Sequence, residues 1–160
     1  MRKKWKRKRA AKNAGKFSFG EGKDMMLNDI GEYLQEKDVG TLGTDLFIGY
    51  FPETPDHCIV LLETEGEAEN HAAGTETPGL QVAARFTDDY GFARGKLKEA
   101  HDALKVIGNE ESGGLASGIV LNGRQYFYVQ PVFSGVMQLE DDSMGRKRIA
   151  KNYLITKEEE

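Results

Sequence analysis

The fold of this chain is decided by residues 26–64, which read MLNDIGEYLQEKDVGTLGTDLFIGYFPETPDHCIVLLET. From Leu27 onward, apolar residues stand at i, i+3, i+6 and i+7, with polar residues such as Asp29 outside this stripe. That spacing predicts an amphipathic helix over residues 26–37. The stretch contains no catalytic motif, so its residues serve the shape of the molecule. We therefore expect a protein that works by fitting against a partner.

A pair of strands is predicted after this helix. Gly40 and Gly43 end the helix and lead into a strand over residues 45–50. The prolines of PETPD, at residues 52–56, exclude helix and fix a turn. The apolar run that follows predicts a central strand over residues 57–64, covered on both faces. Because only a short turn joins the two strands, they are expected to form an antiparallel hairpin.

The middle of the chain predicts an exposed loop, a third strand and a second helix. Residues 65–79 are acidic and rich in Gly, Ala and Thr, which is typical of a loop. The alternation of apolar residues at 80–86 predicts a strand. Residues 90–107 carry an apolar stripe with 3-4-3-4-3 spacing, which predicts a helix. Asp88 and Asp89 precede this helix and supply an N-cap.

The C-terminal part predicts β structure after a flexible segment at residues 109–118. Asn122-Gly123 is a strong tight-turn pair, and Pro131 marks a strand edge or a bulge. Lys157 and the three glutamates after it are expected to form a solvated end. The strands expected in this part occupy residues 119–121, 125–134, 136–140 and 148–156.

These elements predict a single α+β domain, with a mainly antiparallel sheet and two helices packed on one face. A chain of 160 residues is long enough for one domain and too short for two ordinary ones. We expect a basic, disordered tail at residues 1–24, the folded domain at 25–157 and an acidic end at 158–160. No apolar run approaches the ~20 residues of a membrane helix, so no membrane partner is expected. The single cysteine, Cys58, is expected to be a buried thiol in a reducing cytosol.

Charge divides the chain into two unlike parts. Residues 1–23 carry ten Lys/Arg and one acid, whereas the rest of the chain carries twelve Lys/Arg and twenty-five acids. A basic segment of this kind can follow phosphates, and Trp5 is available to stack on a base. A nucleic-acid-binding protein that acts through this basic N-terminal segment is one function to consider. Alternatively, Met25 or Met26 is the natural start of the protein, since the helix pattern begins there. The candidate phosphate contacts are Arg2, Lys3, Lys4, Lys6, Arg7, Lys8 and Arg9.

The folded part lacks the residue patterns of catalytic and metal sites. Its histidines, His57, His71 and His101, show neither HxxxH nor HxH spacing, and no CxxC occurs. His71 stands in the expected loop without a metal-ligand partner nearby. The acidic pairs at 88–89 and 141–142 are better explained as a helix cap and a turn than as cation sites. We therefore expect no enzyme, no cofactor and no metal site.

Several motifs resemble those of a known family. They are the PETPD turn before an apolar strand, the strand-to-helix junction that ends in KLKEAHDAL, and two short patterns near the C-terminus. The first of these patterns holds Gln130, Val132 and Ser134, and the second is the turn at residues 142–146. Over most of the folded domain the sequence resembles the minor capsid, or tail terminator, family of long-tailed bacteriophages that infect Gram-positive hosts.

The resemblance implies an assembly function for a subunit similar in topology to the tail terminator of phage lambda. Such subunits close into a six-fold ring, which caps the tail tube, stops its growth and joins the tail to the head. The implied partners are further copies in a hexamer, the tail tube protein, a head-completion or connector protein, and DNA passing through the ring. The implied location is the head–tail junction of the virion, after assembly in the host cytoplasm.

A ring requires one patch of the subunit to bind a different patch on the next copy. Edge strands supply such patches, because a neighbouring chain can complete their unpaired backbone groups. We expect the strand at 125–134 and the hairpin at 136–148 to provide the contact; alternatively, their apolar residues cover the core of their own domain. The candidate interface residues are Phe133, Val136, Met137, Leu139 and Arg146.

Overall fold

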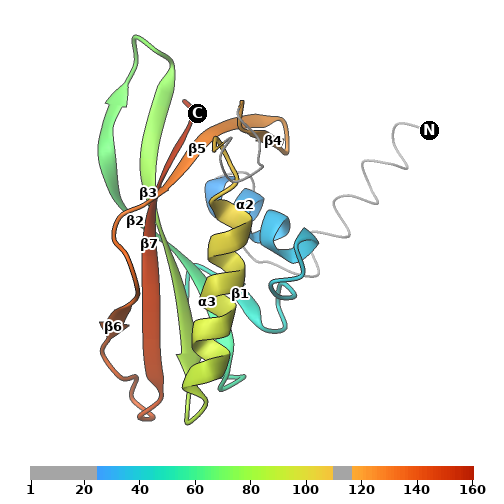
Figure 1. Ribbon diagram of the computed structural model, residues 1–160, viewed down its shortest axis with the longest axis vertical. Helices are drawn as coiled ribbons and strands as arrows, with labels where there is room; N and C mark the ends of the chain where they lie inside the picture. The colour runs from blue at the N-terminus through green and yellow to red at the C-terminus, as the bar shows by residue number, and fades with distance from the viewer. Residues whose placement is uncertain (1–24, 110–116) are drawn as a thin grey trace, which may run out of the picture.

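The computed structural model describes residues 25–109 and 117–160, which form two helices and one curled, mostly antiparallel sheet of seven strands (Figure 1). The predicted α+β single domain is confirmed. The predicted basic tail and most of the predicted flexible segment lie outside the described residues. In chain order the elements are α2 (Met25–Glu36), β1 (Leu46–Ile48), β2 (Cys58–Asn70), β3 (Thr75–Phe86), α3 (Tyr90–Leu104), β4 (Ile119–Leu121), β5 (Arg124–Pro131), β6 (Met137–Leu139) and β7 (Lys147–Glu158).

The two helices pack on one face of the sheet because each buries an apolar stripe there, as predicted. α3 contacts β3 and β7, and α2 contacts β1, β2 and β4 (Figure 1). The predicted N-cap of α3 is confirmed, since the Asp89 carboxylate accepts a hydrogen bond from the Phe92 backbone N at 2.9 Å. In the part of the chain that the structure describes, neither helix is long and apolar enough to cross a membrane. Fully buried side chains on this face include Ile30, Leu34, Leu46, Ile59, Leu80, Leu104 and Ile155.

The strands follow the order β1-β2-β3-β7-β5-β4, and β6 pairs with the first part of β7. β7 therefore has β3 on one side and both β5 and β6 on the other. The predicted hairpin between the first two strands is wrong, because β1 and β2 run parallel, with Leu46 opposite Ile59. A parallel pair needs a connection that returns to the starting end of the first strand. Residues 49–57, which include the PETPD turn, make that return.

The PETPD turn lies against the sheet face that the helices leave open. The Arg85 guanidinium donates a hydrogen bond from Nη2 to the Pro55 carbonyl at 2.5 Å, and its centre lies 5.9 Å from the centroid of the Phe51 ring. Cys58 is fully buried beneath this connection, as predicted, and burial raises the pKa of its thiol. A second, smaller apolar cluster therefore forms on this face; it contains Phe47, Cys58 and Val60, with Phe51 and Leu62 packed against them.

Two other predictions are wrong. The acidic segment predicted as a loop continues β2 and β3 into a long hairpin that extends beyond the helices (Figure 1). We call residues 64–79 the arm. Its strands are held by ladder pairs such as Thr64 with Gly79 rather than by burial, so they need no apolar alternation. The predicted solvated end is also ordered, because β7 runs to Glu158 and Lys157 is fully buried.

Candidate assembly surface

Among the described residues, the sheet ends in open strand edges on both sides. On one side β1 covers β2 only from Ile59 to Leu61, so within the described residues β2 pairs with β3 alone along 64–70. On the other side β4 and β6 are edge strands of three residues each. Such edges can pair with a strand of another chain. The two sides differ in strand length and in charge, so they form two different patches rather than one self-complementary patch.

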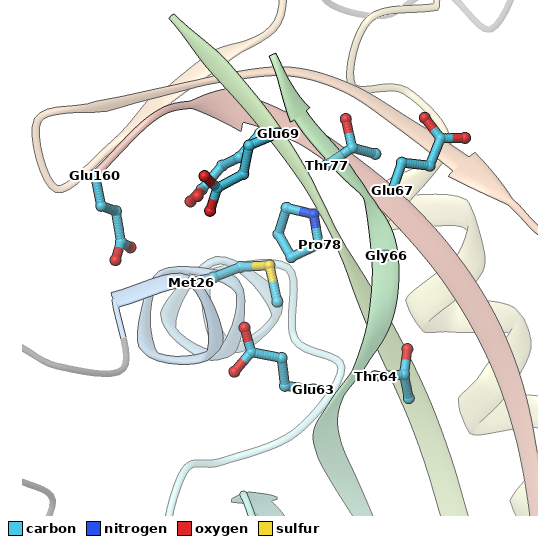
Figure 2. A pocket seen from close by; sticks show the side chains of 10 residues that line it. Met26, Glu63, Thr64, Gly66, Glu67, Glu69, Thr77, Pro78 and Glu160 are labelled. Atoms are coloured by element: carbon cyan, nitrogen blue, oxygen red, sulfur yellow. The ribbon is translucent and has the colours of Figure 1, made fainter. Parts of the chain in front are cut away.

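The arm is acidic, and a hollow of about 300 Å³ lies between it and the start of α2 (Figure 2). Lys157 lies at this end of the sheet, with its Nζ 2.6 Å from Glu76 Oε1 and 3.3 Å from Glu160 Oε1. Of the described residues that line the hollow, five are glutamates and none is basic, so this lining favours a basic partner and repels phosphate. The labelled residues that face the hollow in Figure 2 include Met26, Glu63, Glu69 and Glu160.

Four of the five predicted interface residues come together on the opposite side of the sheet. Met137 and Leu139 lie on β6, next to β7, and both are half-buried. Phe133 and Val136 lie between β5 and β6, and Val136 packs against the main core. The arrangement therefore fits both sequence interpretations, since these side chains cover their own domain and also border an open edge.

Arg146, the fifth predicted interface residue, is buried and engaged within its own chain. Its Nε donates to Asp142 Oδ2 at 2.7 Å, and its Nη1 donates to the Glu53 carbonyl at 2.6 Å and to Asp56 Oδ1 at 3.0 Å. Burial of Asp142 opposes its ionisation, yet hydrogen bonds from Arg146 and from the Met144 backbone hold the pKa of Asp142 below its ordinary value. Arg146 thus fastens the PETPD turn to the final hairpin.

Exposed apolar side chains gather on β4, on β5 and at Val132 just after β5, and only Val132 belongs to a motif noted in the sequence. Val132 is 54% exposed and Val120 is 60% exposed, while Phe127 and Tyr128 are 40% and 41% exposed. Consecutive aromatic residues in a strand point to opposite faces, so they cannot all face one core. The adjacent aromatic residues in the sequence of this strand could therefore have predicted an exposed apolar surface here.

A buried polar network fixes the β4–β5 turn to α2. The Asp29 carboxylate accepts hydrogen bonds from Asn122 Nδ2 at 2.7 Å and from the Tyr126 hydroxyl at 2.5 Å. Burial, then the neighbouring Asp29 carboxylate, raises the pKa of Tyr126, and the hydrogen bonds to Asp29 raise the pKa of Arg124. Both Asn122 and Gly123 have positive φ, as the predicted tight turn requires. The network holds the edge strand β4 in place.

The histidines form no catalytic constellation in the described parts of the chain. His57 stands before β2, and His101 lies half-buried beside the core on α3. His71 was expected to have no metal-ligand partner nearby, and this is wrong, because Glu69 and Glu159 contact its ring. The spacing Glu69-x-His71 was a weak sequence signal, whereas Glu159 is 88 residues away and could not be foreseen. The predicted phosphate contacts at residues 2–9 lie outside the described residues.

Comparison with known families decides the identity of the domain. A family model described as bacteriophage tail terminator protein matches residues 33–159. The chain belongs to the bacteriophage tail terminator family. A search of curated proteins found no match. The predicted resemblance is thus confirmed, and this tail terminator is a structural, non-enzymatic component of the phage tail and hence of the virion, associated with the tail tube.

Proposed function

We propose that this tail terminator closes into a six-membered ring that caps the tail tube, stops its polymerisation and joins the tail to the head. The observation that carries the proposal is the pair of unlike open edges on a domain of the tail terminator family. A ring is built by heterologous contacts, in which one patch binds a different patch on the next copy. The β2 edge of the arm and the β6 side of the sheet are such a pair.

The two patches are complementary in kind. The arm offers backbone groups along residues 64–70, which a neighbouring strand can complete. The β6 side offers a short edge strand with half-buried Met137 and Leu139 and the exposed Val132. Burial of these apolar side chains in the ring would add hydrophobic stabilisation to strand pairing. Arg146 is not part of this proposed contact, because its guanidinium is occupied within the subunit.

The remaining contacts follow from the same ring. Its two faces would bind the tail tube protein and a head-completion or connector protein, and DNA would pass through its centre during transfer. Assembly would take place in the host cytoplasm, before the tail joins the head. The position in the virion would then be the head–tail junction.

The test is to measure mass by light scattering over a range of concentrations, and then to mix the chain with tail tube protein. We expect hexamer-sized rings, free or on tube ends, and tubes that stop growing when the chain is added, both visible by electron microscopy. Because such a subunit can stay monomeric until it meets the tube, the mixing step decides. Tubes that grow to the same lengths with and without the chain, and that show no added density at their ends, would overturn the proposal.

Removal of residues 1–24 separates this function from the nucleic-acid alternative. The ring proposal predicts that the shortened chain folds and still caps tubes. The alternative predicts a loss of nucleic-acid binding, together with its dependence on salt concentration, when the ten basic residues of this segment are removed. The matching control is the capping assay with the full-length chain in the presence of an excess of free oligonucleotide.

A further inference from the structure

The tip of the arm brings three potential metal ligands together. Glu69 is the last residue but one of β2, His71 lies in the turn of the hairpin, and Glu159 follows β7. One ligand atom from each side chain lies within 4.8 Å of the other two. The three residues come from two distant parts of the chain, so their meeting is a product of the fold.

Hydrogen bonds that do not involve the three ligand side chains hold this arrangement. The Glu159 backbone N donates to the Gly74 carbonyl at 2.9 Å, which ties the end of the chain to the turn. Within the turn, the Gly74 backbone N donates to the His71 carbonyl at 3.2 Å, and the Ala73 backbone N donates to Asn70 Oδ1 at 3.2 Å. Gly74 has a φ of +67°, a conformation that suits glycine. The turn therefore presents His71 toward Glu159.

The two carboxylates lie at opposite sides of the imidazole. Glu159 contacts Nδ1, and Glu69 Oε2 lies 3.2 Å from Nε2. A tetrahedral zinc ion keeps its ligand atoms about 3.3 Å apart, so it needs a modest rotation of these side chains. His71 and Glu69 have side chains that are 70% and 54% exposed, so nothing packed around them prevents this rotation.

The chemistry of the ligands favours a borderline metal. One imidazole with two carboxylates, and an open position for water, is a ligand set for Zn²⁺, whereas Mg²⁺ and Ca²⁺ prefer oxygen ligands alone. Glu76 and Glu160 lie in the same acidic region, and the negative charge of such a surface concentrates cations.

We propose that Glu69, His71 and Glu159 form a zinc-binding clasp that fastens the tip of the arm to the C-terminal end of the chain. Zinc would displace the proton from the imidazole nitrogen that it binds, and that proton would pass to solvent. The ladder pairs Thr75–Glu158 and Glu76–Lys157 already join the arm to β7 near its tip, so the clasp would add a side-chain link between the hairpin turn and the residue after β7. The proposal does not depend on ring formation.

The test is calorimetric titration of the full-length chain with ZnCl₂, at a pH where His71 is neutral. We expect one site, and we expect His71→Ala to weaken zinc binding by more than about tenfold, since loss of even an outer partner of a metal ligand costs 10–100-fold. Glu159→Gln should weaken it as well. The matched control is His57→Ala, because His57 bonds to Thr87 and lies away from the arm. The same titration with MgCl₂ should give no binding at this site.

Hydrogen exchange supplies a second readout that does not rest on affinity. Zinc should slow amide exchange at residues 69–75 and 157–160 in the wild type and in His57→Ala, and should leave exchange unchanged in His71→Ala. Equal zinc affinity in the wild type and in His71→Ala would overturn the proposal. Absence of zinc binding below millimolar concentration would do the same. The three residues would then form only a hydrogen-bonded ion pair between His71 and the two carboxylates.

Discussion

Asp29 and Arg124 form a two-point ion pair between α2 and the start of β5. Arg124 Nε lies 2.9 Å from Asp29 Oδ2, and Arg124 Nη2 lies 3.1 Å from Asp29 Oδ1. The carboxylate is fully buried, while the arginine side chain keeps 22% of its surface exposed. Two parallel bonds of this kind fix orientation as well as distance. The pair therefore sets how the edge strand β4 and its turn sit on the first helix.

We expect Asp29→Ala to lower the free energy of unfolding by about 2–4 kcal/mol. Removal of one partner from a buried pair typically costs ~3–5 kcal/mol, and the partial exposure of Arg124 reduces that figure. The buried Tyr126 hydroxyl would also lose its acceptor. Urea unfolding followed by circular dichroism measures the change. Glu32→Gln is the control, since Glu32 is exposed and bonds to the same Asn122, and it should cost less than ~0.5 kcal/mol. Equal stability of the two variants would contradict the network.

Arg146→Met should release the PETPD turn without unfolding the sheet. The substitution keeps an apolar stem over the sheet but removes the donors to the Glu53 carbonyl, Asp56 and Asp142. We expect faster amide exchange and faster proteolysis across residues 50–57, together with a lower melting temperature. The control is Lys147→Met, because the neighbouring Lys147 is exposed and pairs only with Asp141 in the described structure. Unchanged protection of residues 50–57 in Arg146→Met would show that Arg146 does not hold the turn.

The helices could be predicted from the sequence, because their apolar stripes are a local property of the chain. The direction of β1 relative to β2 could not, because it depends on where residues 49–57 return. That path is fixed by Arg85 and Arg146, which lie about 30 and 90 residues further along the chain. A proline turn between two apolar strands is compatible with a hairpin and with a parallel pair, and only these distant contacts distinguish them.

The candidate site shows the same division. The β6 side was predicted because edge strands with apolar residues leave a pattern in the sequence. The arm was missed because its strands are exposed, and exposed strands held by ladder hydrogen bonds need no alternation. From the sequence, Asp29 is expected on the polar face of a helix, and Arg146 in a charged turn. Their burial results from partners about 95 and 90 residues away, which no local pattern records.

Val132→Glu should impair ring assembly while leaving the subunit folded. Val132 is 54% exposed beside the β6 edge, so a charge there should change the stability of the subunit by less than about 0.5 kcal/mol. In the proposed ring the same charge would be buried against the neighbouring subunit without a partner. Electron microscopy of mixtures with tail tube protein measures the fraction of capped tubes. Tyr90→Glu is the control, because Tyr90 is 50% exposed at the start of α3. If both variants cap tubes as well as the wild type does, Val132 is not in the interface.

Acidification should destabilise the domain in part through His101. Burial, followed by the charges of Lys151 and Lys105, lowers the pKa of His101, against the opposing charge of Asp102. The imidazole is therefore neutral in the folded state at pH values where the unfolded chain, with a pKa near ~6.5, has bound a proton. Its stabilising contribution is complete above that value and is lost as the pH falls through the folded pKa. Titration of the ring protons by NMR should give a His101 pKa below ~6.5. Between about pH 5 and 7, the free energy of unfolding should depend less on pH in His101→Gln than in the wild type.

A His101 pKa at or above that of the unfolded chain would contradict this assignment. Tyr153→Phe removes the hydroxyl that lies 3.0 Å from His101 Nδ1, so it separates the effect of the hydrogen bond on the pKa from the effect of burial.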